Sequence, residues 1–256
     1  MPEIGDVIIG IAVTLMLILY VGTAVSIRNI MIGTVVNQII ILAVPIFMMW
    51  YLKMDRKKLF SLKRPSFNKS VIGSLVLFAG IYILMNGITP ILASVFEEST
   101  KHISESFEMI MDYPFIICLL VICVMPAIGE ELFFRGMIYG CFRNKFGVNI
   151  AIISSAAIFG LYHMSLVKFF TTGLLGLCFA YILEVTGSIY VTMALHFINN
   201  FVSLWISKYG EKTELLNRIF SEEQLSSGKI AIIIVVGIIL TGLGYILTAK
   251  KQEVKE

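Results

Sequence analysis

The sequence has few charged residues. Only 14% of its 256 residues are Asp, Glu, Lys or Arg, whereas a soluble domain has about 25%. Hydrophobic residues make up 58%, above the roughly 45–50% of soluble domains. This composition excludes a disordered, collagen-like or disulfide-scaffold protein and indicates a polytopic membrane protein. The net charge of +3 is small, so we expect no nucleic-acid partner.

Several familiar sequence patterns are also missing. The four cysteines form no CxxC pair and all fall in apolar runs, where packing is their expected role. The first apolar run, from Val7, has no Lys or Arg before it and is too long for a signal peptide. Because we find no repeat and no second domain, we expect residues 1–256 to form one integral membrane domain.

The apolar runs predict an all-α membrane bundle of about eight transmembrane helices. About 20 apolar residues are needed to cross a bilayer core of about 30 Å. The expected spans are 7–26, 30–52, 71–96, 114–141, 149–164, 168–186, 188–206 and 230–249. The loop 207–229 has apolar residues at helical spacing and is expected to hold a short interfacial helix.

The charges between the spans predict the orientation in the cell membrane. Residues 53–69 contain seven Lys or Arg and one Asp, which favours the cytosolic side. The loop 97–112 contains five acidic residues and one Lys, and is expected outside. With eight spans, both termini are then cytosolic. Arg28 and Lys168 depart from this pattern, because they are basic residues on the outer side.

The fourth span contains the sequence Gly-Glu-Glu-Leu-Phe-Phe-Arg-Gly at residues 129–136. Charged side chains at the centre of a membrane helix cost at least about 2.5–3.5 kcal/mol each, so they are expected to serve a function. Glu131 and Arg135 are four residues apart and can pair on one helix face. Glu130 lies on another face that has no basic partner. Pro126 is expected to free a backbone carbonyl near this point.

Two of the three histidines also fall in apolar runs. His163 follows Phe159 by four residues, and His196 precedes Asn200 by four residues, so each pair shares a helix face. Counting residues from the expected cytosolic helix ends places Glu130, His163 and Asn200 at one depth, with His196 nearby. We therefore predict that three helices bring these side chains into one site.

A buried Glu, two His and an Asn suit the hydrolysis of an amide. A glutamate assisted by a histidine takes a proton from water, while a second histidine and an amide stabilise the oxyanion. Alternatively, two imidazoles and a carboxylate could hold a divalent metal such as Zn²⁺, with Glu130, His163 and His196 as ligands. The compact zinc-protease motif HExxH is absent, so such a site would be assembled across helices.

The three motifs together resemble those of the CPBP family of intramembrane proteases. This family includes the type II CAAX prenyl proteases and the bacterial Abi or bacteriocin-processing proteins. Its pattern is EExxxR, then FxxxH, then HxxxN. The sequence has Glu130-Glu131-xxx-Arg135, Phe159-xxx-His163 and His196-xxx-Asn200, in that order, within a core of about residues 113–206.

The resemblance implies an eight-helix membrane endopeptidase. It assigns water activation to Glu130 with help from His163, and oxyanion stabilisation to His196 and Asn200. Glu131, Arg135 and Phe159 would support the site. The family is commonly called metalloprotease, and a metal-free glutamate mechanism is also argued for it, so the cofactor stays open.

Three functions compete at this stage. The first is an intramembrane endopeptidase acting on a peptide or membrane-protein substrate in the lipid bilayer. The second is a non-catalytic membrane scaffold or bacteriocin-immunity-type protein of the same fold. The third is a proton-coupled transporter, since buried Glu and His also form proton relays, although the sequence has no repeat symmetry. The identity and prenylation of a substrate and the oligomeric state are left open.

Overall fold

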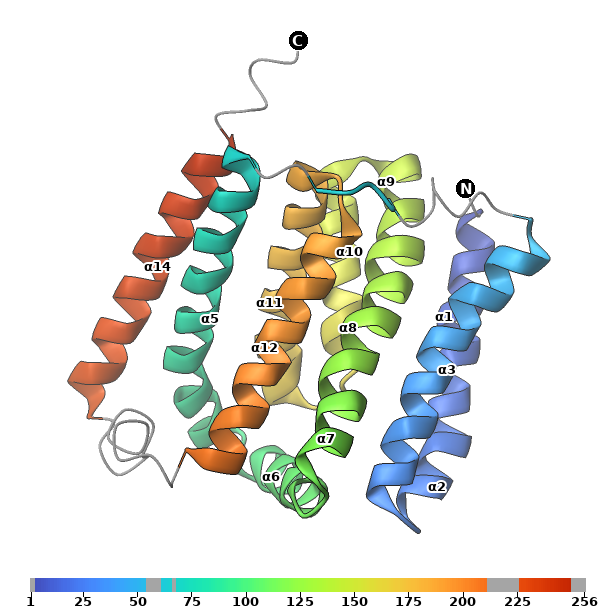
Figure 1. Ribbon diagram of the computed structural model, residues 1–256, viewed down its shortest axis with the longest axis horizontal. Helices are drawn as coiled ribbons and strands as arrows, with labels where there is room; N and C mark the ends of the chain where they lie inside the picture. Colours follow the sequence, from blue (N-terminus) through green and yellow to red (C-terminus); the bar gives the residue numbers. More distant parts are fainter. Residues whose placement is uncertain (1–2, 54–60, 66–67, 211–225, 250–256) are drawn as a thin grey trace.

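The computed structural model describes residues 3–53, 61–65, 68–210 and 226–249, which form an all-α bundle (Figure 1). Labels beginning with η mark π-helical stretches inside longer helices. The elements are α1 (Ile4–Leu17), η1 (Ile18–Gly22), α2 (Thr23–Ser26), α3 (Ile30–Tyr51), α5 (Lys69–Val95), α6 (Glu97–Met111), α7 (Phe115–Cys118), η2 (Leu119–Val124), α8 (Met125–Glu130), η3 (Glu131–Tyr139), α9 (Gly140–Phe146), α10 (Val148–Leu161), α11 (Leu166–Thr186), α12 (Ile189–Tyr209) and α14 (Ser227–Ala249).

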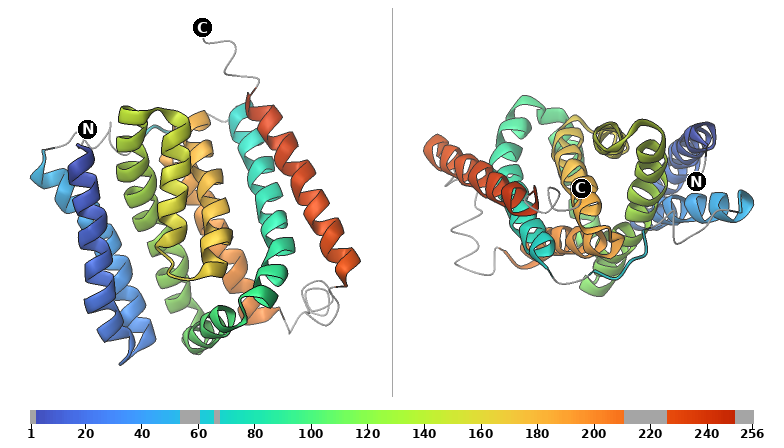
Figure 2. Two further views of the ribbon diagram at one scale, coloured as in Figure 1. Left: turned by 180° about the vertical axis from the view of Figure 1, so that it is seen from behind. Right: turned by 90° about the horizontal axis from the view of Figure 1, so that it is seen from above.

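In the described residues, eight helical rods cross the bundle in alternating directions (Figures 1 and 2). Seven of them are long and apolar enough to span a membrane. The eighth, α10, is apolar but has only 14 residues. The predicted all-α membrane bundle is therefore confirmed. The start of α1 and the end of α14 lie at the same end of the bundle, as an even number of crossings requires (Figure 1).

Helix α10 is shorter than the bilayer core is thick. Its 14 residues cover about 21 Å at 1.5 Å per residue, against a core of about 30 Å. The turn that joins α10 to α11 therefore stops short of the level reached by α3 and α7 (Figures 1 and 2). This recessed turn contains His163. At the opposite end of the bundle, Gly147 and Gly187 make tight turns with φ of 84° and 64°, a region that favours glycine.

The segment 97–112, expected as an outer loop, is mostly helix α6, which lies across one end of the bundle (Figure 1). Apolar side chains recur in it at helical spacing, at Ile103, Phe107, Ile110 and Met111, and all four are buried or half-buried. The acidic residues between them hid this amphipathic pattern. The interfacial helix expected within 207–229 falls largely outside the described residues.

The fourth rod, which runs from α7 to α9, contains two π-helical stretches, η2 before Pro126 and η3 after it. Pro126 lies just after η2 and has no N–H to donate to the carbonyl of Ile122, four residues earlier. The lost hydrogen bond gives a local reason for the wider turn. Such stretches are frequent at functional sites, and η3 contains both Glu131 and Arg135.

Helix α14 packs chiefly against α5, through glycines spaced by seven residues. A Cβ atom added at Gly80 of α5 would lie 2.3 Å from the backbone nitrogen of Thr241. One added at Gly244 of α14 would lie 2.3 Å from the nitrogen of Leu77. The two backbones therefore touch without intervening side chains, which is a common way for membrane helices to associate.

We predict that Gly80→Val lowers the free energy of unfolding by about 1–3 kcal/mol, because the added side chain must push the two backbones apart. Gly242→Val is the matched control, since a Cβ atom there meets nothing within 4 Å. Unfolding of both variants in detergent micelles measures the difference. Equal midpoints for the two variants would show that the α5–α14 contact is not tight.

Candidate active site

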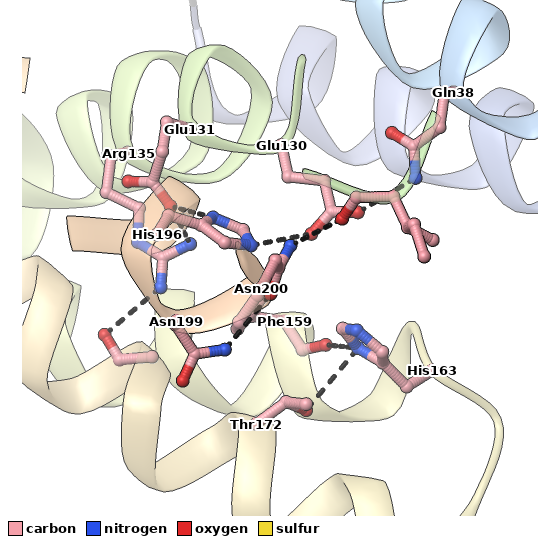
Figure 3. A network of polar contacts seen from close by, with 12 residues as sticks. Gln38, Glu130, Glu131, Arg135, Phe159, His163, Thr172, His196, Asn199 and Asn200 are labelled. Atoms are coloured by element: carbon pink, nitrogen blue, oxygen red, sulfur yellow. Dashed lines mark hydrogen bonds and ion pairs between the residues drawn. The ribbon is translucent and has the colours of Figure 1, made fainter. Parts of the chain in front are cut away.

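The centre of the site is the imidazole of His196, which lies between two carboxylates. Its Nδ1 is 3.0 Å from Oε1 of Glu131, and its Nε2 is 3.8 Å from Oε2 of Glu130 (Figure 3). The same oxygen of Glu131 accepts a hydrogen bond of 3.1 Å from Nη1 of Arg135. All four side chains are buried. Glu131 can only accept hydrogen bonds when ionised, so Nδ1 of His196 is the donor in this contact.

Arg135 is held in place from three sides. Besides pairing with Glu131, its Nη2 donates to the carbonyl oxygen of Gly176 at 3.3 Å. Its guanidinium carbon lies 4.3 Å from the ring centre of Phe159 and 5.3 Å from that of Phe179. Aromatic faces attract a cation, so they compensate part of the desolvation of this charge. The predicted supporting residues Glu131, Arg135 and Phe159 thus form one buried group.

Glu130 is held by a residue of another helix. Its Oε1 accepts a hydrogen bond of 3.1 Å from Nε2 of Gln38 in α3 (Figure 3). Its other oxygen faces His196, and its side chain is about nine-tenths buried. The two adjacent carboxylates of the fourth rod therefore have different environments. Glu131 forms an ion pair with Arg135, while Glu130 has a neutral donor on one oxygen and an imidazole near the other.

His163 is positioned by the recessed turn after α10. Its Nδ1 is 2.9 Å from the carbonyl oxygen of Phe159 and 3.4 Å from Oγ1 of Thr172. A carbonyl only accepts, so Nδ1 carries the proton and Nε2 of the neutral ring keeps its lone pair. The next residue, Met164, has φ of 48°, a strained region for a non-glycine residue. The chain thus reverses direction directly after the histidine.

Asn200 is oriented by two further hydrogen bonds. Its Nδ2 donates to the carbonyl of Ile122 at 2.9 Å, and its Oδ1 accepts from Nδ2 of Asn199 at 3.0 Å. Ile122 is the residue whose carbonyl Pro126 cannot reach with an N–H. The proline effect predicted from the sequence is therefore present, because the freed carbonyl holds the amide. The amide group of Asn200 has a second N–H besides the one that donates to Ile122.

The predicted site residues come together from three segments of the chain. Glu130, Glu131, Arg135 and His196 form a continuous chain of contacts (Figure 3). His163 does not bond to this chain, but its ring lies against Phe159, whose ring also contacts His196 and Arg135. Asn200 is tied to the backbone beside the site.

The predicted metal ligands Glu130, His163 and His196 are not arranged as a metal centre. No three Asp, Glu, His or Cys side chains in the described part of the chain are grouped closely enough to hold an ion. Both nitrogens of His196 face carboxylates, and Nδ1 of His163 faces a backbone carbonyl. Nδ1 of each histidine is engaged, as it commonly is in metal-ligating histidines, but the three side chains are not gathered closely enough in the described structure to hold a divalent metal.

Sequence reasoning missed several side chains that contact the predicted residues, among them Gln38, Thr172 and Phe179. Gln38 binds Glu130, and Thr172 lies against His163. Gln38 could have been found as a polar amide inside an apolar run. No feature of the sequence pointed to Thr172. Asn199, the neighbour of Asn200, holds it by donating to its Oδ1.

The fold and the site define a class: a multi-pass membrane bundle with two carboxylates and an imidazole buried among its helices, beside a half-buried imidazole and amide. Residues 112–202 match a family model described as Rce1-like, type II CAAX prenyl endopeptidase. This segment contains all three motifs, so the resemblance to the CPBP proteases is confirmed. No curated protein and no solved structure matches the chain.

Proposed function

We propose that this protein is an intramembrane endopeptidase that hydrolyses a peptide bond in a membrane-associated protein or peptide. The observation that carries the proposal is the carboxylate of Glu130. It is buried, held by Gln38 and 3.8 Å from His196, and it forms no ion pair with Lys or Arg in the described residues. A carboxylate in this state is available to take a proton from water.

In the proposed reaction, a water molecule lies between Glu130 and the free Nε2 of His163. Glu130 takes a proton as the water oxygen attacks the peptide carbonyl, and His163 orients the water. The tetrahedral intermediate then expels the amine, which receives the proton from Glu130. The products are one new carboxylic acid, which releases its proton to water, and one new amine.

The negative oxygen of the intermediate needs hydrogen-bond donors. Asn200 has a free N–H for this role, because its other N–H is bound to Ile122. His196, when protonated on both nitrogens, donates from Nδ1 to Glu131 and from Nε2 toward the oxyanion. Glu131 and Arg135 fix the plane of this ring, as the carboxylate of a catalytic triad does.

The proposed partners are a peptide or membrane-protein substrate and the lipid bilayer. The end of the bundle that includes residues 61–65, the start of α1 and the end of α14 faces the cytosol in this proposal. A protease-accessibility assay on intact cells tests the orientation. A protease added outside intact cells is expected to cut α6. Cleavage of α6 only in permeabilised cells would contradict the proposed orientation.

Cleavage of a fluorogenic peptide library by detergent-purified protein tests the function. Wild type is expected to cut internal bonds, and His163→Ala is expected to reduce the rate. His102→Ala is the matched control, because His102 is exposed on α6. Cleavage is expected to persist with a chelator. Equal rates for wild type and His163→Ala would assign the activity to a contaminant and favour a non-catalytic scaffold.

Gln38→Leu is expected to reduce kcat by about 10- to 100-fold, because a freed Glu130 side chain can turn away from the water. Asn86→Leu is the control, since this exposed amide bonds only to its own helix at Tyr82. Initial rates at saturating peptide measure the effect. An unchanged kcat for Gln38→Leu would mean that Glu130 is positioned without this donor.

A further inference from the structure

Lys168 is a charged residue whose position the proposed reaction does not explain. It is half-buried and is the third residue of α11, a helix whose start points toward the end of the bundle opposite residues 61–65 (Figure 1). The N-terminus of a helix has a partial positive charge, so an ammonium group there is repelled. The position also opposes the charge pattern of the other loops. A lysine here destabilises the helix end and calls for another role.

The face of α11 that contains Lys168 is turned toward the site. Residues 168, 172 and 176 follow one another at intervals of four and share this face. The carbonyl of Gly176 accepts from Arg135, and Oγ1 of Thr172 lies 3.4 Å from Nδ1 of His163. Lys168 is the outermost member of this row. The recessed turn sets the start of α11 back from the end of the bundle (Figures 1 and 2).

The ammonium group of Lys168 has no counter-ion among the described residues. None of the ion pairs there includes it. One turn further along the same face, Thr172 contacts His163 of the site. An unpaired cation in a poorly solvated place attracts an anion more strongly than one at the protein surface.

We propose that Lys168 binds a carboxylate of the substrate and thereby sets which peptide bond reaches Glu130. This inference rests on the proposed function, because it takes the substrate to be a peptide. The carboxylate is either the C-terminal group of the peptide or an Asp or Glu side chain near the scissile bond. Lys168 is in this view a positioning and specificity residue, and Glu130 remains the base.

Peptide binding tests this inference without requiring cleavage. The probes are fluorescent peptides from the library in two matched pairs: one with a C-terminal carboxylate or amide, the other with an internal Glu or Gln. Fluorescence anisotropy gives the Kd of each probe for wild type and for Lys168→Met. Wild type is expected to bind the carboxylate member of one pair at least about tenfold more tightly. The pair that shows this preference identifies the source of the carboxylate.

Lys168→Met is expected to lose this preference while keeping the affinity for the neutral member. Lys168→Arg is expected to restore it, and Lys101→Met, which removes an exposed lysine of α6, is expected to retain it. An equal loss of affinity for both members, a preference that survives in Lys168→Met, or no preference in wild type overturns the inference. A preference without cleavage would support the carboxylate site and count against the proposed protease.

Discussion

Glu130→Gln is expected to reduce kcat for peptide cleavage by about 10²–10⁴-fold, the usual contribution of a general base. The substitution keeps the size of the side chain and an oxygen that can accept from Gln38, but it removes the ability to take a proton. The folded structure is therefore expected to persist. Initial rates at saturating peptide give kcat, and thermal unfolding in detergent checks the fold.

Glu108→Gln is the matched control for this experiment. It makes the same chemical change at an exposed position of α6, and its rate is expected to equal that of wild type. If Glu130→Gln retained more than about a tenth of the wild-type kcat, general-base catalysis by Glu130 would be wrong.

Arg135→Leu is expected to lower the free energy of unfolding by about 3–5 kcal/mol, because it leaves Glu131 buried without its charge partner. Glu131 is fully buried, and Arg135 is the only Lys or Arg of the described chain that forms an ion pair with it. The loss also frees His196, whose ring is fixed through Glu131. Chemical unfolding in detergent micelles measures the change.

Replacing both partners separates the ion pair from packing. The double variant Glu131→Leu, Arg135→Leu removes both charges, so its loss of stability is expected to be smaller than that of Arg135→Leu alone. Arg28→Leu, at an exposed position, is the control and is expected to unfold like wild type. A free energy of unfolding of Arg135→Leu within about 1 kcal/mol of that of wild type would show that Glu131 has another charge partner.

The helices were predictable because a bilayer sets an absolute length for each apolar run. Each expected span has a helix in the structure, with bounds that differ by a few residues. The end of the fifth span was less predictable. Its apolar run continues to residue 164, but α10 ends at Leu161, and the chain turns at Met164 into α11. Hydropathy does not encode such a recessed turn, and this turn positions His163.

The charged part of the site was predictable for a different reason. A carboxylate or guanidinium in an apolar run is costly, so Glu130, Glu131 and Arg135 stood out by type alone. Gln38 costs less to bury and did not stand out, although it binds Glu130 from a helix about 90 residues away in sequence. The contacts of His196 with Glu130 and Glu131 could not be predicted either, because they depend on how α12 packs against the fourth rod.

The helical register near the site was the least predictable feature. The spacing of Glu131 and Arg135 fits an α-helix, and the ion pair does form, but on the π-helical stretch η3. Pro126 indicated a disturbed turn, and the structure shows how it is used: the free carbonyl of Ile122 holds Asn200. A partner so distant in sequence is set by tertiary packing.

The most direct test of hydrolysis by Glu130-activated water is to trace the water oxygen into the product. Peptide is incubated in H₂¹⁸O with wild type or with Glu130→Gln, and the fragments are analysed by mass spectrometry. Wild type is expected to cleave internal bonds and to place ¹⁸O in the newly formed carboxyl group, whereas Glu130→Gln is expected to give almost no labelled fragment. Labelled fragments formed at the same rate by both proteins would contradict this mechanism.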